Sequence, residues 1–588
     1  MRSVERARVT EILVWFLFGS GAIVYHLSLY SLSTENPLPF LALLAGIILQ
    51  ALSATLFVGQ LIRAGPELSG RQRNLQILYV LAFSTSMAFT RLSRYAGFNG
   101  FDFVQESTVL QNTLANGYWD PTLGQLSNYQ SSLAITMLPT MTSGIVHVPG
   151  ALAFLFQTFI LIALLPVAVH PIINSMSGSF RLATLSSLLL AQNWFYFGQH
   201  LIGKTALALF ICVLAFYCLT QKKNNLRALG IFLSLGVAMS HYTISLFLVF
   251  ILLSYFALSK IALPIIRVTP FFRKSPSIGF NTLPVVTSIV LIVLWLSFAA
   301  PMVLPTATSS AEQALSSINQ LASGPKGASA SLALSTTAGP IVTGWFDFQN
   351  ALIGLGGLLM LNRYRKGRLG EGLSIWTLVG LSLVTLLAAW IVLPYLSVRV
   401  ESTRILNMIL PFTIAFVGVL LVRILRPPSR LTTIAVLCLI LLMLPMNLQL
   451  SNQANSILFH SENSLPLDKQ FDADTGTVPT FSNYAMAIWA DKNIPSNKPV
   501  EVDALGRYAF TTVLPFPQEL NYSQEELPPF TFHRYTILSS YFVNRAIWSS
   551  TILGASVEIP GEDPSYFFSP AHNVLYSSPK FWIVSPAP

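Results

Sequence analysis

Residues 228–259 read ALGIFLSLGVAMSHYTISLFLVFILLSYFALS, and this stretch decides the topology of the whole chain. It is apolar on both sides of the polar His241, which lies near its middle. As one helix the stretch would cross a membrane once, whereas as two short helices it would cross twice. Because a single helix would move every later loop to the other side of the membrane, the loops can decide between the two arrangements.

The composition is that of a membrane protein. Of 588 residues, 53% are hydrophobic and only 10% are charged, against roughly 25% charged in a typical soluble domain. Many apolar runs are about twenty residues long, the length that crosses roughly 30 Å of hydrocarbon. A transmembrane β-barrel would show short alternating segments in place of these continuous runs. The sequence therefore predicts a polytopic α-helical membrane protein.

Thirteen spans are predicted from the apolar runs: 11–32, 38–62, 75–91, 151–173, 182–198, 203–220, 228–241, 243–259, 283–303, 344–361, 372–396, 405–422 and 431–448. The first run follows basic residues, as in a signal peptide, but it is too long and lacks a clear small-residue cleavage site. We therefore keep it as a span. Residues 131–150 are too polar and are broken by proline, so we predict an interfacial or re-entrant helix there.

The distribution of basic residues fixes the orientation. Lys and Arg collect in the cytoplasmic loops of membrane proteins. When the predicted loops are taken alternately, one set holds 21 Lys and Arg and the other holds 6. This bias requires that 228–259 forms two spans, and it places the N-terminus in the cytoplasm. The same loops explain the formal charge of +10, so nucleic acid is not an expected partner.

Two domains follow from this topology. Residues 1–448 are predicted to form the transmembrane domain, in which 92–150 is the first large outside loop and the Ser- and Ala-rich 304–343 a mobile outside loop. Because the number of spans is odd, residues 449–588 lie outside. They hold 13 of the 24 acidic residues and alternate helix and strand signals, which indicates a small extracytoplasmic α/β domain. The chain is thus predicted to be a multi-pass protein of the cell membrane.

Three acidic residues stand in the first outside loop, within GFNGFDFVQESTVLQNTLANGYWDP (97–121). Asp102 and Glu106 are four residues apart and would share one face of a helix. Such a pair could hold a divalent cation or act as a general base beside a metal ligand, or it could be the wet face of a loop helix. Asp120 precedes a proline and is interpreted as a turn residue.

Other ionisable residues are predicted on the same side, where they would be costly in lipid and are therefore candidates for function. Lys204 could contact either lipid headgroups or a substrate phosphate, and His241 could be either a core histidine or a functional group at a helix break. Arg404, at the start of a span, suits a lipid phosphate, although it could also pair with Glu401. The remaining candidates are His200 and Arg399.

Several enzyme classes are excluded by missing motifs. The chain has no Walker A loop, no HExxH zinc-protease motif and no GxSxG nucleophile elbow. The cytoplasmic loops are short and basic, which leaves no room for a domain that binds a nucleotide sugar. If the protein is an enzyme, its donor is expected on the outside and linked to lipid.

A series of short segments resembles a known superfamily. The segments are GFDFVQESTVLQNTLANGYWDP, GKTALALFICVLAF, AMSHYTIS, ESTRILNMILP and, in the tail, AIWADKNIPSNKPVEVDALGRYAF and HNVLYSSPKFWIV. In this order they resemble the GT-C glycosyltransferases, which include oligosaccharyltransferases, protein O-mannosyltransferases and aminoarabinose transferases. The closest resemblance is to a mainly archaeal multi-spanning family of this type.

The resemblance implies a reaction and roles for the candidates. A sugar would pass from a polyprenyl-phosphate-linked donor to a glycan, lipid or protein acceptor at the extracytoplasmic face, among membrane lipids. In this resemblance the catalytic residues would be Asp102 and Glu106. The donor phosphate would be bound by Arg404, Lys204 and Arg399. The acceptor or a metal would be positioned by His241 and His200. A divalent cation, Mg²⁺ or Mn²⁺, is a candidate cofactor held by Asp102, Glu106 and His241.

The sequence also departs from the superfamily. It has Asp102 and Glu106 where the mannosyltransferases have adjacent Asp and Glu, and Gly203-Lys204 where members of the closest family often have Arg-Gln. It lacks the WWDXG motif of oligosaccharyltransferases. The alternatives are a transporter or flippase of polyprenyl-linked glycans, a polymerase or ligase of surface polysaccharide, and a degenerate scaffold that only organises partners.

Overall fold

The computed structural model describes most of the helical part of the chain. Described are residues 2–33, 40–63, 69–94, 131–193, 203–266, 281–301, 340–392 and 402–424, six strands between 500 and 586, and short pieces or single residues elsewhere, Glu106 among them.

The described helices run in chain order: α1 (Arg2–Ser33), α2 (Phe40–Arg63), α3 (Gly70–Arg94), α5 (Met137–Val146), α6 (Gly150–Ser177), α7 (Phe180–Ala191), α9 (Gly203–Leu219), α10 (Asn224–Ser240), α11 (Tyr242–Ala257), the π-helix η2 (Leu258–Ala262), α12 (Leu263–Ile266), α13 (Thr282–Ala299), α16 (Pro340–Arg365), α17 (Glu371–Val392) and α19 (Ser402–Ile424).

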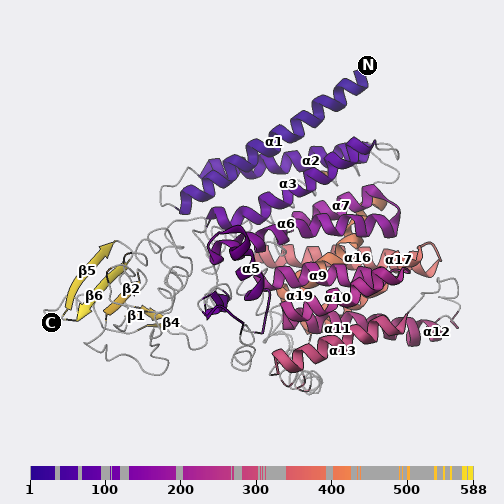
Figure 1. The fold of residues 1–588 in the computed structure, drawn as a ribbon. Coiled ribbons are helices and arrows are strands. Elements are labelled where there is room, and N and C mark those ends of the chain that lie inside the picture. Colours follow the sequence, from indigo (N-terminus) through magenta and orange to yellow (C-terminus); the bar gives the residue numbers. More distant parts are fainter. Residues whose placement is uncertain are drawn as a thin grey trace.

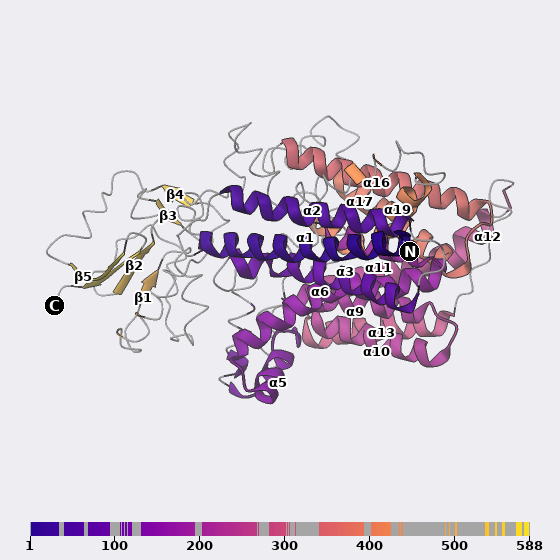
Figure 2. The same ribbon diagram turned by 90° about the horizontal axis from the view of Figure 1, so that it is seen from above.

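The long helices pack side by side into one bundle (Figures 1 and 2). Helices α1, α2 and α3 form a layer along one side, and α10, α11 and α13 lie on the opposite side. Helix α19 lies at the centre of the bundle, since 89% of its most apolar, membrane-length segment is buried, against 33% for the corresponding segment of α1. The apolar side chains that α1 and α13 leave exposed suit contact with lipid.

The structure supports a helical membrane protein. Among the described residues, seven helices are long and apolar enough to cross a membrane. Helices occupy twelve of the predicted spans, but several are shorter than a bilayer requires, and most of 431–448 lies outside the described residues. The count of thirteen crossings is therefore not confirmed. The predicted loop at 304–343 also lies largely outside the described residues, and α16 already begins at Pro340.

The stretch 228–259 forms two helices, as predicted. Helix α10 ends at Ser240, and His241 has an extended backbone with φ −160° and ψ 122° before α11 begins. The chain reverses there. Near the end of α11, the ring of Tyr255 lies 6.1 Å from that of Phe216, near the end of α9. Helix α11 thus returns to the end of the bundle at which α10 began.

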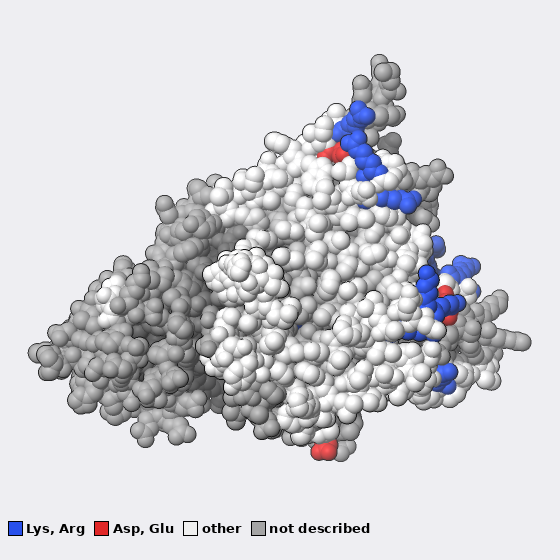
Figure 3. All heavy atoms as spheres, viewed as in Figure 1, with Lys and Arg blue, Asp and Glu red and all other residues white. Residues whose placement is uncertain are grey.

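One end of the bundle carries the Lys and Arg side chains that are visible on the surface in Figure 3, and we call it the basic end. At this end the exposed Lys222 of the α9–α10 turn pairs with Glu371, the first residue of α17, at 2.7 Å. The basic end comprises Arg8, Arg71, Arg73, Lys222, Lys223, Arg227, Arg365, Lys366, Arg368 and Arg423. These belong to the loops predicted to be cytoplasmic. The opposite end, where α9, α11 and α19 begin, we call the site end.

Helices α16 and α19 approach closely because α16 carries a glycine at their crossing. A Cβ atom at Gly356 would lie 2.3 Å from the carbonyl oxygen of Phe416. Moving either backbone away would disrupt other packing contacts, because both helices are packed into the bundle. Nothing lies within 4 Å of the corresponding position at Gly354, two residues earlier.

We therefore expect opposite effects from two neighbouring substitutions. Gly356→Ala should destabilise the protein by about 1–3 kcal/mol through overpacking. Gly354→Ala should stabilise it by about 0.5–1 kcal/mol, because alanine loses less backbone entropy in a helix. Thermal unfolding of both variants in detergent tests this, and equal effects would contradict the close packing of α16 on α19.

The described part of the C-terminal segment consists of strands. They are β1 (Val500–Val502), β2 (Tyr535–Ser539), β3 (Ile547–Ser549), β4 (Ser556–Glu558), β5 (His572–Ser578) and β6 (Phe581–Pro586). Four form a sheet in the order β1-β2-β6-β5, and β3 pairs with β4. The β1–β2 pair is parallel and the other pairs are antiparallel. Figure 1 shows the strands beyond the site end. Most of the predicted helical part lies outside the described residues.

Candidate functional site

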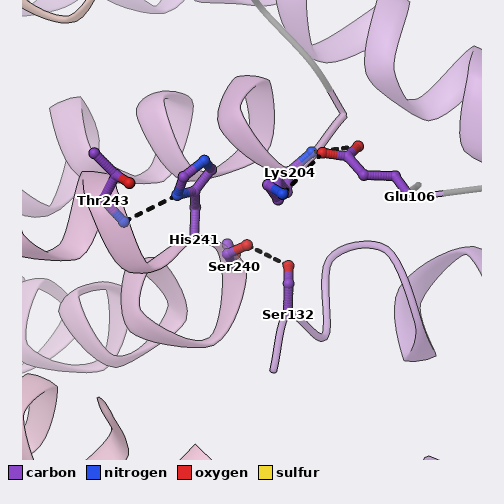
Figure 4. A network of polar contacts seen from close by, with 6 residues as sticks. All are labelled: Glu106, Ser132, Lys204, Ser240, His241 and Thr243. Atoms are coloured by element: carbon purple, nitrogen blue, oxygen red, sulfur yellow. Dashed lines mark hydrogen bonds and ion pairs between the residues drawn. The ribbon is translucent and has the colours of Figure 1, made fainter. Parts of the chain in front are cut away.

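A buried ion pair lies at the site end (Figure 4). The Nζ atom of Lys204 is 3.4 Å from Oε1 of Glu106, and the side chains are 3% and 0% exposed. The other oxygen of Glu106 accepts a hydrogen bond from the backbone N–H of Lys204 at 3.4 Å. Glu106 therefore places a negative charge at the N-terminus of α9, where the helix dipole favours one.

A glycine lets α9 bury this lysine. A Cβ atom at Gly203, the first residue of α9, would lie 2.2 Å from the ring of Phe154 on α6. The segment that carries Glu106 packs on the same ring, since Val109 and Leu110 cluster with Phe154 and Ile135. The tight contact between α9 and α6 thus brings the two charges together in an apolar surrounding.

His241 caps the N-terminus of α11. Its Nδ1 atom accepts a hydrogen bond from the backbone N–H of Thr243 at 3.0 Å. A neutral imidazole has one accepting and one donating nitrogen, so the proton belongs on Nε2. In this arrangement the Nε2–H group of His241 is a hydrogen-bond donor. His241 then has no lone pair on Nε2 for a metal.

Tyr242 links the histidine to the ion pair. Nζ of Lys204 lies 5.9 Å from the centroid of the Tyr242 ring, a cation–π contact. The rings of Tyr242 and His241 are 4.9 Å apart. The start of α11 and the start of α9 are therefore held against each other. The site thus has a charged side chain and a hydrogen-bond donor on neighbouring helices.

The irregular segment 131–136 crosses over the break between α10 and α11. The hydroxyl of Ser132 donates to the carbonyl oxygen of Ser240, and the N–H of Leu133 donates to that of Met239 at 2.7 Å. Ser132 is 2% exposed. Non-helical backbone at membrane depth is tolerated where it is buried in protein. This segment therefore fixes the position of His241.

Helix α5, which follows this segment, exposes apolar side chains. Leu138, Met141 and Ile145 are 39%, 55% and 75% exposed and fall on one face at a spacing of three and four. Figure 2 shows α5 projecting from the side of the bundle. For residues 131–150 the sequence predicts an interfacial or re-entrant helix, and such a face is consistent with the interfacial alternative.

The structure brings three of the predicted site residues together, namely Glu106, Lys204 and His241. Arg404 lies in the first turn of α19, as predicted, but its side chain is not among those described. Asp102, His200 and Arg399 lie outside the described residues, so their roles stay predictions.

Sequence reasoning missed the pairing of Glu106 with Lys204 and the contribution of Tyr242. It also missed Ser132, although the polar Ser131-Ser132 before an apolar run marked the segment as unusual. The small Gly203 beside Lys204 was a further signal of close packing.

The described residues do not fit a divalent cation at Glu106. The Lys204 ammonium at 3.4 Å would repel a cation bound there. His241 uses the lone pair of Nδ1 in capping α11. No group of three His, Cys, Asp or Glu side chains able to hold a metal is found in the part of the chain that the structure describes. A metal held with Asp102 therefore stays a prediction.

Substitutions at His241 separate capping from donation. His241→Ala should lower the free energy of unfolding by about 0.5–2 kcal/mol, because the N–H of Thr243 loses its acceptor. His241→Asn should retain most of the stability, since asparagine also caps helices, but it lacks the donating Nε2 atom. Thermal unfolding in detergent measures the difference, and equal losses in both variants would contradict the capping role.

Comparison with known proteins gives weak likenesses to solved structures. No known protein family matches the sequence, and no curated protein is recognisably similar. Among solved structures, the archaeal oligosaccharyltransferase AglB from Archaeoglobus fulgidus, in complex with an inhibitory peptide and a dolichol-phosphate, is 13% identical with a TM-score of 0.36. It is matched over 78% of this chain and 62% of its own.

The apo form of the oligosaccharyltransferase from the same organism is 12% identical with a TM-score of 0.39, over 79% of this chain and 62% of its own. This chain thus spans less than two thirds of the length of these structures. A likeness of this size does not establish a common fold.

Proposed function

We propose that the protein is an integral-membrane glycosyltransferase that moves a sugar from a polyprenyl-phosphate-linked donor to an acceptor at the extracytoplasmic face. The cell membrane is its proposed location, with the basic end in the cytoplasm and the site end outside. The proposal rests on the resemblance of the segments around Asp102, Lys204, His241 and Arg404 to the GT-C enzymes, together with the geometry of the site end.

The observation that carries it is the buried pair of Glu106 and Lys204, which lies at the start of α9, the end of that helix opposite the basic end. Ionisable groups buried in a membrane domain are costly and are more often functional than in water. Glu106 stands four residues after Asp102 in the sequence, and Lys204 is linked to His241 through the ring of Tyr242. A one-sided site of this kind suits a reaction at one membrane face better than transport through the bilayer.

In the proposed reaction Asp102 takes the proton of an acceptor hydroxyl, which requires hydrogen-bond contact with it. The acceptor oxygen bonds to the anomeric carbon of the donor sugar. The bond from that carbon to the phosphate oxygen breaks, and polyprenyl phosphate leaves with the electron pair. Arg404 stabilises the charge that develops on the phosphate. Lys204, held in place by Glu106, is a further candidate for this role. Arg399 and His200 are further candidates for binding, and His241 donates from Nε2 to position the acceptor.

The test is incubation of the purified protein in lipid vesicles with labelled polyprenyl-phosphate mannose or glucose and a panel of glycan, lipid and peptide acceptors. We expect a labelled product together with released polyprenyl phosphate. Movement of the intact labelled donor between the leaflets, without a product, would instead support the flippase alternative. A labelled product that grows by repeated units would support the polymerase alternative.

A further inference from the structure

Four buried amide side chains and the half-buried Asn350 gather where α7, α16 and α19 meet, below the site end. Gln192 and Asn193 directly follow α7, Gln349 and Asn350 belong to α16, and Asn407 belongs to the second turn of α19. Gln192 and Asn407 are 2% and 3% exposed, and Asn193 and Gln349 are also buried. We call these five residues the amide cluster.

One hydrogen bond and the packing of the helices place the members of the amide cluster near one another. Nδ2 of Asn193 donates to Oε1 of Gln349 at 2.9 Å, which joins the end of α7 to α16. Helices α16 and α19 both run toward the basic end and touch at Gly356 and Phe416. Gln349 and Asn407 precede these contact residues by about 10 and 14 Å of helix at 1.5 Å per residue, so they lie at similar depth.

Helix α7 runs the opposite way along α19. A Cβ atom at Gly418 of α19 would lie 2.3 Å from Oγ of Ser186 on α7. From Ser186, Gln192 lies about 9 Å further toward the site end. It therefore reaches the level of the third turn of α19, about 7 Å deeper in the bundle than Asn407, a separation that a sugar ring between the two side chains can bridge.

Three members of the amide cluster, Gln192, Asn350 and Asn407, carry amide atoms without a hydrogen-bond partner within the described ranges. Both amide atoms of Gln192, both of Asn407, and Oδ1 of Asn350 are buried and have no hydrogen-bond partner among the described residues. Burying an unpaired amide costs free energy, and native proteins rarely do so. Several such atoms at one junction of three helices indicate a ligand that supplies the missing partners.

The chemistry of amides selects that ligand. Each amide presents two N–H donors and one carbonyl acceptor. A phosphate would satisfy the donors only, whereas hydroxyl groups both donate and accept. The five side chains carry no charge, which suits a neutral ligand. Arg404 stands three residues before Asn407, and residues three apart share a helical face. An anionic group bound near Arg404 would thus be followed, deeper in the bundle, by a hydroxylated one.

We propose that the amide cluster binds the hydroxyl groups of a sugar ring. That this sugar belongs to the polyprenyl-phosphate-linked donor rests on the function proposed above. In this arrangement the phosphate lies at the level of Arg404, and the ring beneath it is recognised by Gln192 and Asn407.

The test compares Gln192→Leu and Asn407→Leu with the unchanged protein in detergent. Leucine has a similar size and cannot hydrogen-bond. The probes are the methyl glycosides of mannose, glucose and N-acetylglucosamine, and binding is followed by saturation-transfer NMR. We expect at least one glycoside to bind and each variant to bind it at least tenfold more weakly. We also expect unfolding temperatures equal to or above that of the unchanged protein, because a buried unpaired amide has been removed. Asn225→Leu, which removes an exposed amide at the basic end, is the matched control and should change neither.

Three results would overturn the proposal: no glycoside binding by the unchanged protein, unchanged binding in both variants, or lower unfolding temperatures with binding retained. Glycoside binding needs no chemical step, so the two proposals fail separately. Binding that depends on Asn407 without any sugar transfer would end the proposed function and leave the amide cluster as a sugar site. Sugar transfer that is unaffected by both variants would support the proposed function and exclude the amide cluster as a sugar site.

Discussion

Replacing Glu106 with leucine is expected to lower the free energy of unfolding by about 3–5 kcal/mol, because it removes the carboxylate that faces a buried ammonium. Lys204 is 3% exposed and cannot reach bulk water without opening the contact between α9 and α6. The backbone N–H of Lys204, in the first turn of α9, would also lose the carboxylate as its acceptor. Thermal or denaturant unfolding in detergent measures the effect.

Two controls separate this pair from ordinary surface charges. The double variant Glu106→Leu with Lys204→Met removes both charges and should recover most of the loss, since apolar replacement of a whole buried pair is often close to neutral. Glu371→Leu breaks the exposed pair with Lys222 at the basic end and should cost about 0–1 kcal/mol. If Glu106→Leu alone were as stable as the unchanged protein, the result would contradict the burial of the pair.

Replacing Asp102 with asparagine is expected to lower the rate of sugar transfer by about 100- to 10,000-fold, the usual contribution of a general base. The amide keeps the shape of the carboxylate but cannot accept the proton of the acceptor hydroxyl. The unfolding temperature should stay unchanged, in contrast to Glu106→Leu. Single-turnover transfer with labelled donor measures the chemical step.

Asp120→Asn is the matched control for this prediction, since Asp120 belongs to the same loop and is interpreted as a turn residue. It should transfer sugar at a rate close to that of the unchanged protein. Full activity of Asp102→Asn would exclude Asp102 as the base.

The helices were largely predictable because hydrophobic length is a strong local signal. The split at His241 is an example: the basic residues of distant loops required it, and the structure has two helices there. The ends of helices were less predictable. The span predicted at 182–198 continues past Ala191, where α7 ends, because the residues that follow are again aromatic and apolar.

The site was predictable only in part. Orientation alone placed Glu106, Lys204 and His241 at one end, and the structure brings them together. Their partners were not predictable, since Glu106 and Lys204 are 98 residues apart and no local pattern links them. The amide cluster escaped notice because Asn and Gln carry no charge and stand singly or in pairs in apolar runs. Its meaning depends on the packing of three helices.

The central claim is that the reaction takes place at the site end. It is tested most directly in vesicles in which the orientation of the protein is known. The protein is reconstituted with labelled polyprenyl-phosphate sugar, and a membrane-impermeant acceptor is supplied on one side only. An impermeant thiol reagent reports the side of the basic end through Lys222→Cys in a Cys438→Ser background, since the other two cysteines are buried. Labelled product is expected only when the acceptor is on the side opposite residue 222. Product that forms with the acceptor on the same side as residue 222 would contradict the account.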